Sequence, residues 1–175
     1  MELNEAVALI QYPRQQLLMP ETWADLGCGT GLFTRALSQL LPPDSTLYAV
    51  DKDKNALNAI PRIPGIHLQK VVADFTADTW EGERLDGILM ANSLHYVSDQ
   101  PAFLQRLLQH MQPAAGFLIV EYDTSIANPW VPYPLSYPAL QQLFTSQGYQ
   151  HIQRLGTRPS VYGRPMMYAA YISRK

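Results

Sequence analysis

Residues 23–34 read Trp-Ala-Asp-Leu-Gly-Cys-Gly-Thr-Gly-Leu-Phe-Thr, an apolar run followed by glycines at three alternate positions. Because glycine has no Cβ atom, the backbone at Gly27, Gly29 and Gly31 can turn sharply, and a ligand can lie against the main chain. In an open parallel sheet, ligands bind outside the carboxyl ends of the strands. The segment therefore predicts a strand over 21–26, a ligand-binding loop, and a helix that begins near residue 32.

A carboxylate marks the end of the next apolar run. We expect a second strand over 46–50, and Asp51 follows it, twenty residues after Gly31. A carboxylate at this place accepts hydrogen bonds from the two vicinal hydroxyls of a ribose. The glycine loop and Asp51 together predict a site for a nucleoside-containing cofactor.

The spacing and the charge of the loop discriminate between such cofactors. The nicotinamide-type fingerprint is G-x-G-x-x-G, whereas this loop is G-x-G-x-G, followed by Leu32 and Phe33. Asp25, two residues before Gly27, would repel a diphosphate and attract an ammonium group. These features disfavour an NAD(P)-dependent oxidoreductase, which stays the alternative enzyme class. They favour a cationic sulfonium cofactor with an amino-acid tail.

Apolar runs alternate with segments of helical period along the chain, which is typical of an α/β fold. Helices are expected over 2–10 (ended by Pro13), 32–41, 52–60 and 98–111, and through Leu140, Leu143 and Phe144 up to Gly148. Further strands are expected over 68–72, 85–90, 117–121, 151–155 and 166–172. The last two follow each other directly around Gly163, which predicts a hairpin.

Composition limits the class of protein. Of the 175 residues, 47% are hydrophobic and 16% are charged, so we expect a single domain, 1–175. The formal net charge of -2 disfavours binding to nucleic acid. Neither an apolar run of membrane-spanning length nor a signal-like start is present, so we expect a cytoplasmic protein without a membrane partner. We also expect a monomer or a weak homodimer. The single cysteine, Cys28, excludes an internal disulfide, and no metal site is predicted.

Two later strand ends extend the pattern: Ala73-Asp74-Phe75 follows the third strand, and Ala91-Asn92-Ser93-Leu94-His95-Tyr96 follows the fourth. With residues 25–31 and Asp51, these motifs resemble those of class I S-adenosylmethionine-dependent methyltransferases, closest to the small-molecule branch of the UbiE and type 11 families. The resemblance implies a Rossmann-like, seven-stranded, mostly parallel sheet of order 3-2-1-4-5-7-6, with only the seventh strand antiparallel and helices on both faces. It also implies S-adenosyl-L-methionine as cofactor and S-adenosyl-L-homocysteine as product.

The resemblance further implies where the cofactor binds. The three loop glycines would pass under its methionine and ribose portion, with Asp25 near the methionine amino group. Asp51 would hold the ribose hydroxyls, Asp74 the adenine amino group with Phe75 beside the ring, and the Asn92 main chain the methionine moiety. The expected cofactor-binding set is Asp25, Gly27, Cys28, Gly29, Thr30, Gly31, Asp51, Lys52, Asp74, Phe75, Asn92 and Ser93.

Some of these residues also have a plainer interpretation. Asp74 is a residue type that caps turns, and Asn92 and Ser93 are equally typical turn formers. The chain could also be a non-catalytic domain that binds S-adenosylmethionine or an interaction partner.

Methyl transfer is an in-line displacement that mainly requires alignment of the acceptor and exclusion of water. If the acceptor is a phenol, an alcohol or an ammonium, its proton needs a base, and His95 is the best-placed candidate. The alternative is a structural histidine at a helix entry. Tyr96, Tyr12 and Glu121 are weaker candidates.

The acceptor is indicated by the stretch 107–153, which contains no Lys or Arg and only Glu121 and Asp123 as acids. We expect a lid loop over 124–138, where prolines hold aromatic side chains out at low entropic cost, and a short helical cap over 1–20. Together they predict a pocket for an apolar or aromatic small molecule. Its expected lining residues are Tyr12, Tyr96, Trp130 and Tyr133. Packing against the last helix and a dimer contact are the alternatives for the loop.

Basic residues gather at the end of the chain instead, as Arg154, Arg158, Arg164, Arg174 and Lys175. They are interpreted as solvated side chains that flank the hairpin. The alternative is an anionic acceptor or a short stretch of phosphate.

Overall fold

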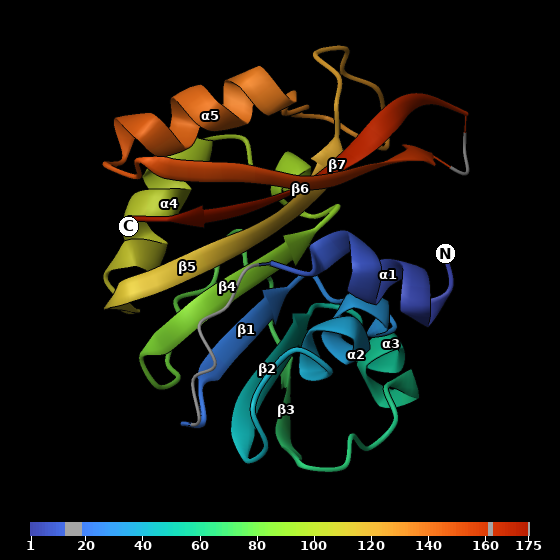
Figure 1. Ribbon diagram of the computed structural model, residues 1–175, viewed down its shortest axis with the longest axis vertical. Helices are drawn as coiled ribbons and strands as arrows, with labels where there is room; N and C mark the ends of the chain where they lie inside the picture. The colour runs from blue at the N-terminus through green and yellow to red at the C-terminus, as the bar shows by residue number, and fades with distance from the viewer. Residues whose placement is uncertain (13–18, 161–162, 175) are drawn as a thin grey trace.

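The computed structural model describes residues 1–12, 19–160 and 163–174. They form a seven-stranded sheet in the order β3-β2-β1-β4-β5-β7-β6 (Figure 1). The strands are β1 (Thr22–Leu26), β2 (Ser45–Asp51), β3 (Ile66–Val72), β4 (Leu85–Ala91), β5 (Met111–Tyr122), β6 (His151–Ser160) and β7 (Gly163–Ser173). β7 is antiparallel to β5 and β6, and the other neighbouring strands are parallel. The predicted strand order and the single antiparallel strand are confirmed.

Helices cover both faces of this sheet, as predicted (Figure 1). They are α1 (Leu3–Ile10), α2 (Leu32–Ser38), α3 (Lys54–Ala59), α4 (Gln100–Leu108) and α5 (Tyr137–Ser146). Side chains of α1 and α2 share one core cluster with Leu89 and Leu118 of the sheet, whereas α4 and α5 share another with Ile88 and Ile119. Leu118 and Ile119 are adjacent on β5 and both fully buried, because the strand is covered on both faces.

Several boundaries differ from the sequence prediction, and two of the differences have a clear physical reason. α3 begins at Lys54 and not at residue 52, because the Asp53 side chain caps it by accepting hydrogen bonds from the N–H groups of Asn55 and Ala56. Met111, predicted on the helix of 98–111, lies on β5, where it pairs with Leu85. It is nevertheless buried, so the core prediction for this side chain is confirmed although its element was wrong.

The hairpin at the end of the chain is confirmed, and both of its strands are longer than predicted because their pairing continues past Arg158 and Met167. Pro13, the expected end of the first helix, lies outside the described residues, as does most of the expected N-terminal cap beyond residue 12. None of the helices in the described parts of the chain has the length and apolar character needed to cross a membrane.

Candidate functional site

The glycine loop joins β1 to α2 and is fixed to the end of β2. Gly27, Gly29 and Gly31 have φ angles of 79°, 53° and 81°, in the left-handed region where glycine is unstrained. The N–H groups of Gly27 and Cys28 both donate to the Val50 carbonyl, at 2.8 and 3.1 Å. The loop is therefore held directly beside Asp51, the residue that follows Val50.

The three glycines serve different purposes. A Cβ atom on Gly27 would lie 2.6 Å from the Cβ of Ser93, and one on Gly31 would lie 2.7 Å from Cγ1 of Ile60. A Cβ on Gly29 would meet no described atom within 4 Å. Gly27 and Gly31 thus permit close packing inside the protein, whereas Gly29 presents bare backbone to open space.

Asp51 stands at the end of β2 with its carboxylate turned toward this loop. Its Oδ2 accepts a hydrogen bond from the Gly29 N–H at 2.8 Å, and its Oδ1 accepts one from the Asp53 N–H at 2.9 Å. A carboxylate offers about four acceptor positions, so two remain for further donors. The neighbouring Lys52 is exposed.

Asp25 lies beneath the loop and not on its surface, with an exposed fraction of 1%. Thr34 donates its hydroxyl to Oδ2 at 2.6 Å, while Oδ1 is buried without a partner among the described residues. Burial, with a contribution from the nearby Asp51 charge, raises the pKa of Asp25 to about 7. The site therefore contains a buried acceptor atom on a carboxyl group that titrates near neutral pH.

The other two loop residues differ in exposure. Cys28 is buried, and burial raises the pKa of its thiol well above the ordinary value, so it has none of the thiolate character that a nucleophile needs. Thr30 is exposed at the tip of the loop.

Asp74 and Phe75 follow the third strand as expected. Oδ1 of Asp74 accepts hydrogen bonds from the N–H and the hydroxyl of Thr76, at 3.0 and 2.7 Å, and the latter bond lowers the pKa of Asp74. Asp74 thus does cap a turn. Phe75 lies beside the glycine loop, because its Cε1 would be 3.0 Å from a Cβ on Gly27.

Asn92 and Ser93 close the site on the β4 side. Asn92 has a φ of 54° and a buried Oδ1 that finds no partner among the described residues. A left-handed non-glycine residue is uncommon and costs conformational energy, and such residues cluster at functional sites. Ser93 donates its hydroxyl to the Leu26 carbonyl at 2.6 Å, which ties the ends of β1 and β4 together.

His95 is buried in the 3-10 turn η1 (Leu94–Tyr96) and pairs with Glu121 of β5. Its Nδ1 lies 2.7 Å from Oε2 of Glu121, and its backbone N–H donates to Oε1 at 3.1 Å. The sequence placed both residues among the candidates but did not indicate that they pair. The available signal was one acid inside an otherwise apolar strand.

The segment after β5 lies beside this turn. The Tyr133 N–H donates to the His95 carbonyl at 3.0 Å. Earlier in this segment, residues 128–131 form a tight turn. Its Asn128 side chain accepts hydrogen bonds from the N–H groups of Trp130 and Val131. Trp130 at the turn is 80% exposed, and Tyr96 is about half exposed.

Tyr12 is not brought together with these aromatic residues. It is buried against the opposite face of the sheet, where it stacks on Tyr171 with ring centroids 4.5 Å apart and lies 6.0 Å from Trp23. The expected grouping of Tyr12 with Tyr96, Trp130 and Tyr133 is therefore wrong for Tyr12, whereas Tyr133 lies beside the turn that carries Tyr96.

The described arginines at the end of the chain contact acids or aromatic rings. Arg154 lies 3.6 Å from Asp123, with its guanidinium 3.8 Å from the Tyr137 ring centroid, and Arg158 lies 2.8 Å from Glu5. Arg174 lies over the ring of Tyr149. The side chain of Arg164 and all of Lys175 are outside the described residues.

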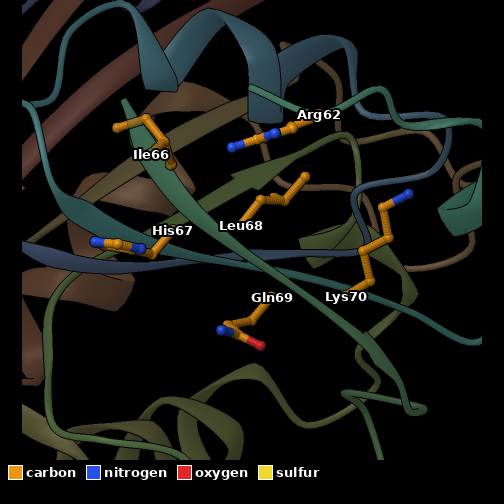
Figure 2. Close-up of a pocket in the computed structure, with 6 residues that line it drawn as sticks. All are labelled: Arg62, Ile66, His67, Leu68, Gln69 and Lys70. Atoms are coloured by element: carbon orange, nitrogen blue, oxygen red, sulfur yellow. The ribbon is translucent and has the colours of Figure 1, made fainter. Parts of the chain in front are cut away.

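A hollow of about 420 Å³ lies along β3, at the edge of the sheet (Figure 2). Its lining side chains are Arg62, Ile66, His67, Leu68, Gln69 and Lys70. They precede the carboxyl end of the strand at Val72, so this hollow is separate from the candidate site.

Residues 4–162 match a family model described as "Methyltransferase domain". A curated relative, trans-aconitate 2-methyltransferase of Pseudomonas aeruginosa, is 34% identical over 95 residues, which are 54% of this chain and 33% of the relative. The chain therefore matches about a third of the length of this relative.

Solved structures share the fold. The 1,6-didemethyltoxoflavin-N1-methyltransferase of Burkholderia thailandensis superposes with a TM-score of 0.68 at 20% identity, covering 98% of this chain and 77% of that one. An S-adenosylmethionine-dependent methyltransferase of Mesorhizobium loti gives a TM-score of 0.65 at 16% identity, covering 90% and 92%. With the family model spanning most of its length, the chain belongs to the methyltransferase domain family.

Proposed function

We propose that this chain is an S-adenosylmethionine-dependent methyltransferase that transfers a methyl group to a small apolar or aromatic acceptor by in-line displacement. The observation that carries the proposal is the bare backbone at Gly29 held 2.8 Å from the Asp51 carboxylate at adjacent strand ends. This arrangement suits a ribose whose hydroxyls donate to Asp51 while the rest of the cofactor lies along the loop.

The polar atoms around the loop fit the other parts of that cofactor. The unpartnered oxygens of Asp25 and Asn92 are acceptors, which suits an ammonium group with its three donors. Because Asp25 lies beneath the surface, we expect it to act mainly through its charge. On the adenine side, Phe75 would pack on the ring, and Asp74, whose Oδ1 is engaged by Thr76, would use its other oxygen. Cys28, Thr30, Lys52 and Ser93 would complete the lining.

The acceptor side is proposed to lie between η1 and the segment 124–138. Tyr96, Trp130 and Tyr133 are exposed there on a stretch with few charges, and aromatic side chains of this kind bind apolar rings well. The neighbour from Burkholderia thailandensis was solved with bound 1,6-didemethyltoxoflavin and S-adenosylhomocysteine, which supports the combination of this fold with a small acceptor. In this proposal the segment 124–138 serves as a lid.

The proposal is tested by incubating the protein with methyl-labelled S-adenosylmethionine and a panel of phenols, aryl amines and trans-aconitate. We expect label on an aromatic acceptor. Label on trans-aconitate alone would contradict the acceptor class, and binding of the cofactor without label on any acceptor would favour a non-catalytic domain. The cytoplasmic location, the single domain 1–175 and the monomeric or weakly dimeric state stay predictions, which fractionation, limited proteolysis and size-exclusion chromatography check.

A further inference from the structure

A single buried carboxylate holds His95 at two points. Glu121 is fully buried on β5, and its two oxygens contact the backbone N–H and the ring Nδ1 of His95, at 3.1 and 2.7 Å. The two contacts together fix both the position of the turn and the orientation of the imidazole. The pair lies on the face of the sheet that α4 and α5 cover, in line with Ile119 on the same strand.

This contact also selects the tautomer of the ring. When Glu121 is ionised it accepts hydrogen bonds and donates none, so Nδ1 then carries the proton that points to Glu121. Nε2 is then the bare, basic nitrogen, and among the described residues it has no hydrogen-bond partner. An imidazole held in this way accepts a proton at Nε2, and the carboxylate stabilises the imidazolium that results.

The side chains that face the pair do not compete with the imidazole as proton acceptor. Tyr168 lies opposite Glu121 on β7, donates its hydroxyl to the Leu135 carbonyl at 2.8 Å, and has its pKa raised by burial, so it stays neutral. Asp123 directly follows the end of β5 and pairs with Arg154. The ring of Tyr122 lies 6.1 Å from that of His95.

Tyr96 packs against the imidazole and is itself partly exposed. The two ring centroids are 4.4 Å apart, and Tyr96 is about half exposed whereas His95 is 2% exposed. A side chain that is half exposed can change rotamer readily, whereas the buried pair behind it cannot.

We propose that His95 Nε2 is the general base for methyl transfer and that Glu121 is its positioning residue; this inference rests on the proposed function. The acceptor therefore reacts through a hydroxyl or a protonated amine. Tyr96 moves aside to admit this group. The proton of a hydroxyl passes to Nε2 as the new bond to the methyl carbon forms, whereas a protonated amine gives its proton to Nε2 first, which frees the electron pair that attacks the methyl carbon. The carbon–sulfur bond breaks with its electron pair going to sulfur, and the proton leaves later from His95 to solvent. A carboxylate acceptor carries no proton at neutral pH and would give the pair nothing to remove.

The test compares the wild type with Glu121→Gln, His95→Gln and a control, Asp123→Asn, which lies just beyond the end of β5. A glutamine at position 121 keeps the size of the side chain and can accept from the His95 N–H, but its amide donates to Nδ1 and so favours the wrong tautomer. We expect the ¹⁵N shifts of the His95 ring to report an Nδ1–H tautomer in the wild type and an Nε2–H tautomer in Glu121→Gln, both with S-adenosylhomocysteine bound. With a phenol from the panel, kcat should fall by about 10²–10⁴-fold both in His95→Gln and in Glu121→Gln. The acidic limb of the kcat–pH profile should vanish in His95→Gln, and Asp123→Asn should match the wild type.

The outcomes separate this inference from the proposed function. If the wild type does not bind S-adenosylhomocysteine, the proposed function fails. If it binds this product but its His95 is the Nε2–H tautomer, the inference is overturned whatever the panel shows. Unchanged kcat and an unchanged pH profile in Glu121→Gln would also overturn it, since the pair would then only hold the turn.

Discussion

The carboxyl edge of the sheet has two halves that are specified in different ways. The proposed cofactor half, formed by the glycine loop and Asp51, is built from backbone conformation within one stretch and its neighbouring strand end. The proposed acceptor half, formed by η1, the end of β5 and the segment 124–138, depends on side-chain contacts such as that between His95 and Glu121, which are 26 residues apart. Backbone sites leave a mark in the sequence because few residues adopt the required geometry, whereas pairings over long distances leave almost none.

The largest effect is expected from Gly27→Ala, which breaks the cofactor half through its packing. The new Cβ would lie 2.6 Å from Ser93 Cβ and 3.0 Å from Phe75, at a φ of 79°. Left-handed strain costs about 1–2 kcal/mol and overpacking about 1–3 kcal/mol. The free energy of unfolding, measured in urea, should fall by about 2–5 kcal/mol.

Gly29→Ala is the matched control, because its Cβ would meet no described atom within 4 Å. It should lose only the strain, about 1–2 kcal/mol, yet weaken the binding of S-adenosylhomocysteine by filling the space beside the backbone. Equal destabilisation in the two variants would contradict the distinction between the packed and the open glycine.

Asp51→Ala should leave a folded protein that binds the cofactor poorly. Hydrogen bonds to a charged group contribute about 1.5–3 kcal/mol each, so losing one or two to the ribose should raise the Kd for S-adenosylhomocysteine by about 10–10⁴-fold. Isothermal titration calorimetry measures this change. Asp53→Ala is the control: it removes the cap of α3, which costs about 1 kcal/mol of stability, and should leave the Kd unchanged. A similar Kd in both variants would remove Asp51 from the site.

Asp25 should make binding and stability respond to pH in opposite directions. Its pKa in the folded protein, about 7, lies above the ordinary 3.8, so its stabilising contribution is complete below about pH 4 and is lost as the pH rises through 7. Between pH 5 and 8 the wild type should therefore lose stability relative to Asp25→Asn. Over the same range its affinity for S-adenosylhomocysteine should rise, because the ionised carboxylate attracts the ammonium group. Thermal unfolding and calorimetry check the two trends, and parallel pH curves for wild type and variant would contradict them.

Trp130→Ala should give the smallest effect, and it should weaken only the binding of the acceptor. The side chain is 80% exposed, so the free energy of unfolding should change by no more than about 0.5 kcal/mol. The Kd for S-adenosylhomocysteine should not change, while KM for an aromatic acceptor should rise roughly tenfold, as expected when about 1–2 kcal/mol of ring contact is lost. An unchanged KM would exclude this residue from the pocket.

The sequence predicted the fold where local chemistry determines it. The terminal hairpin and the loop glycines follow from alternating apolar runs and from residues that tolerate a positive φ. The strand order came instead from the resemblance to class I methyltransferases. The boundary near Met111 was missed because its pairing with Leu85 across the sheet outweighs a helical spacing that looks continuous in the sequence.

The site was predicted unevenly for the same reason. Asp51 and the glycines stand where expected, whereas Tyr12 packs against Tyr171 on the far face, a contact that no short-range pattern indicates. The bond between Glu121 and His95 was missed because it joins two elements that only the folded sheet brings together.

The central claim, that the glycine loop and Asp51 hold S-adenosylmethionine, is tested most directly by titrating the purified wild-type protein with S-adenosylhomocysteine and, separately, with NAD. We predict saturable binding of one S-adenosylhomocysteine per chain and no binding of NAD. Binding of NAD without binding of S-adenosylhomocysteine would contradict the account.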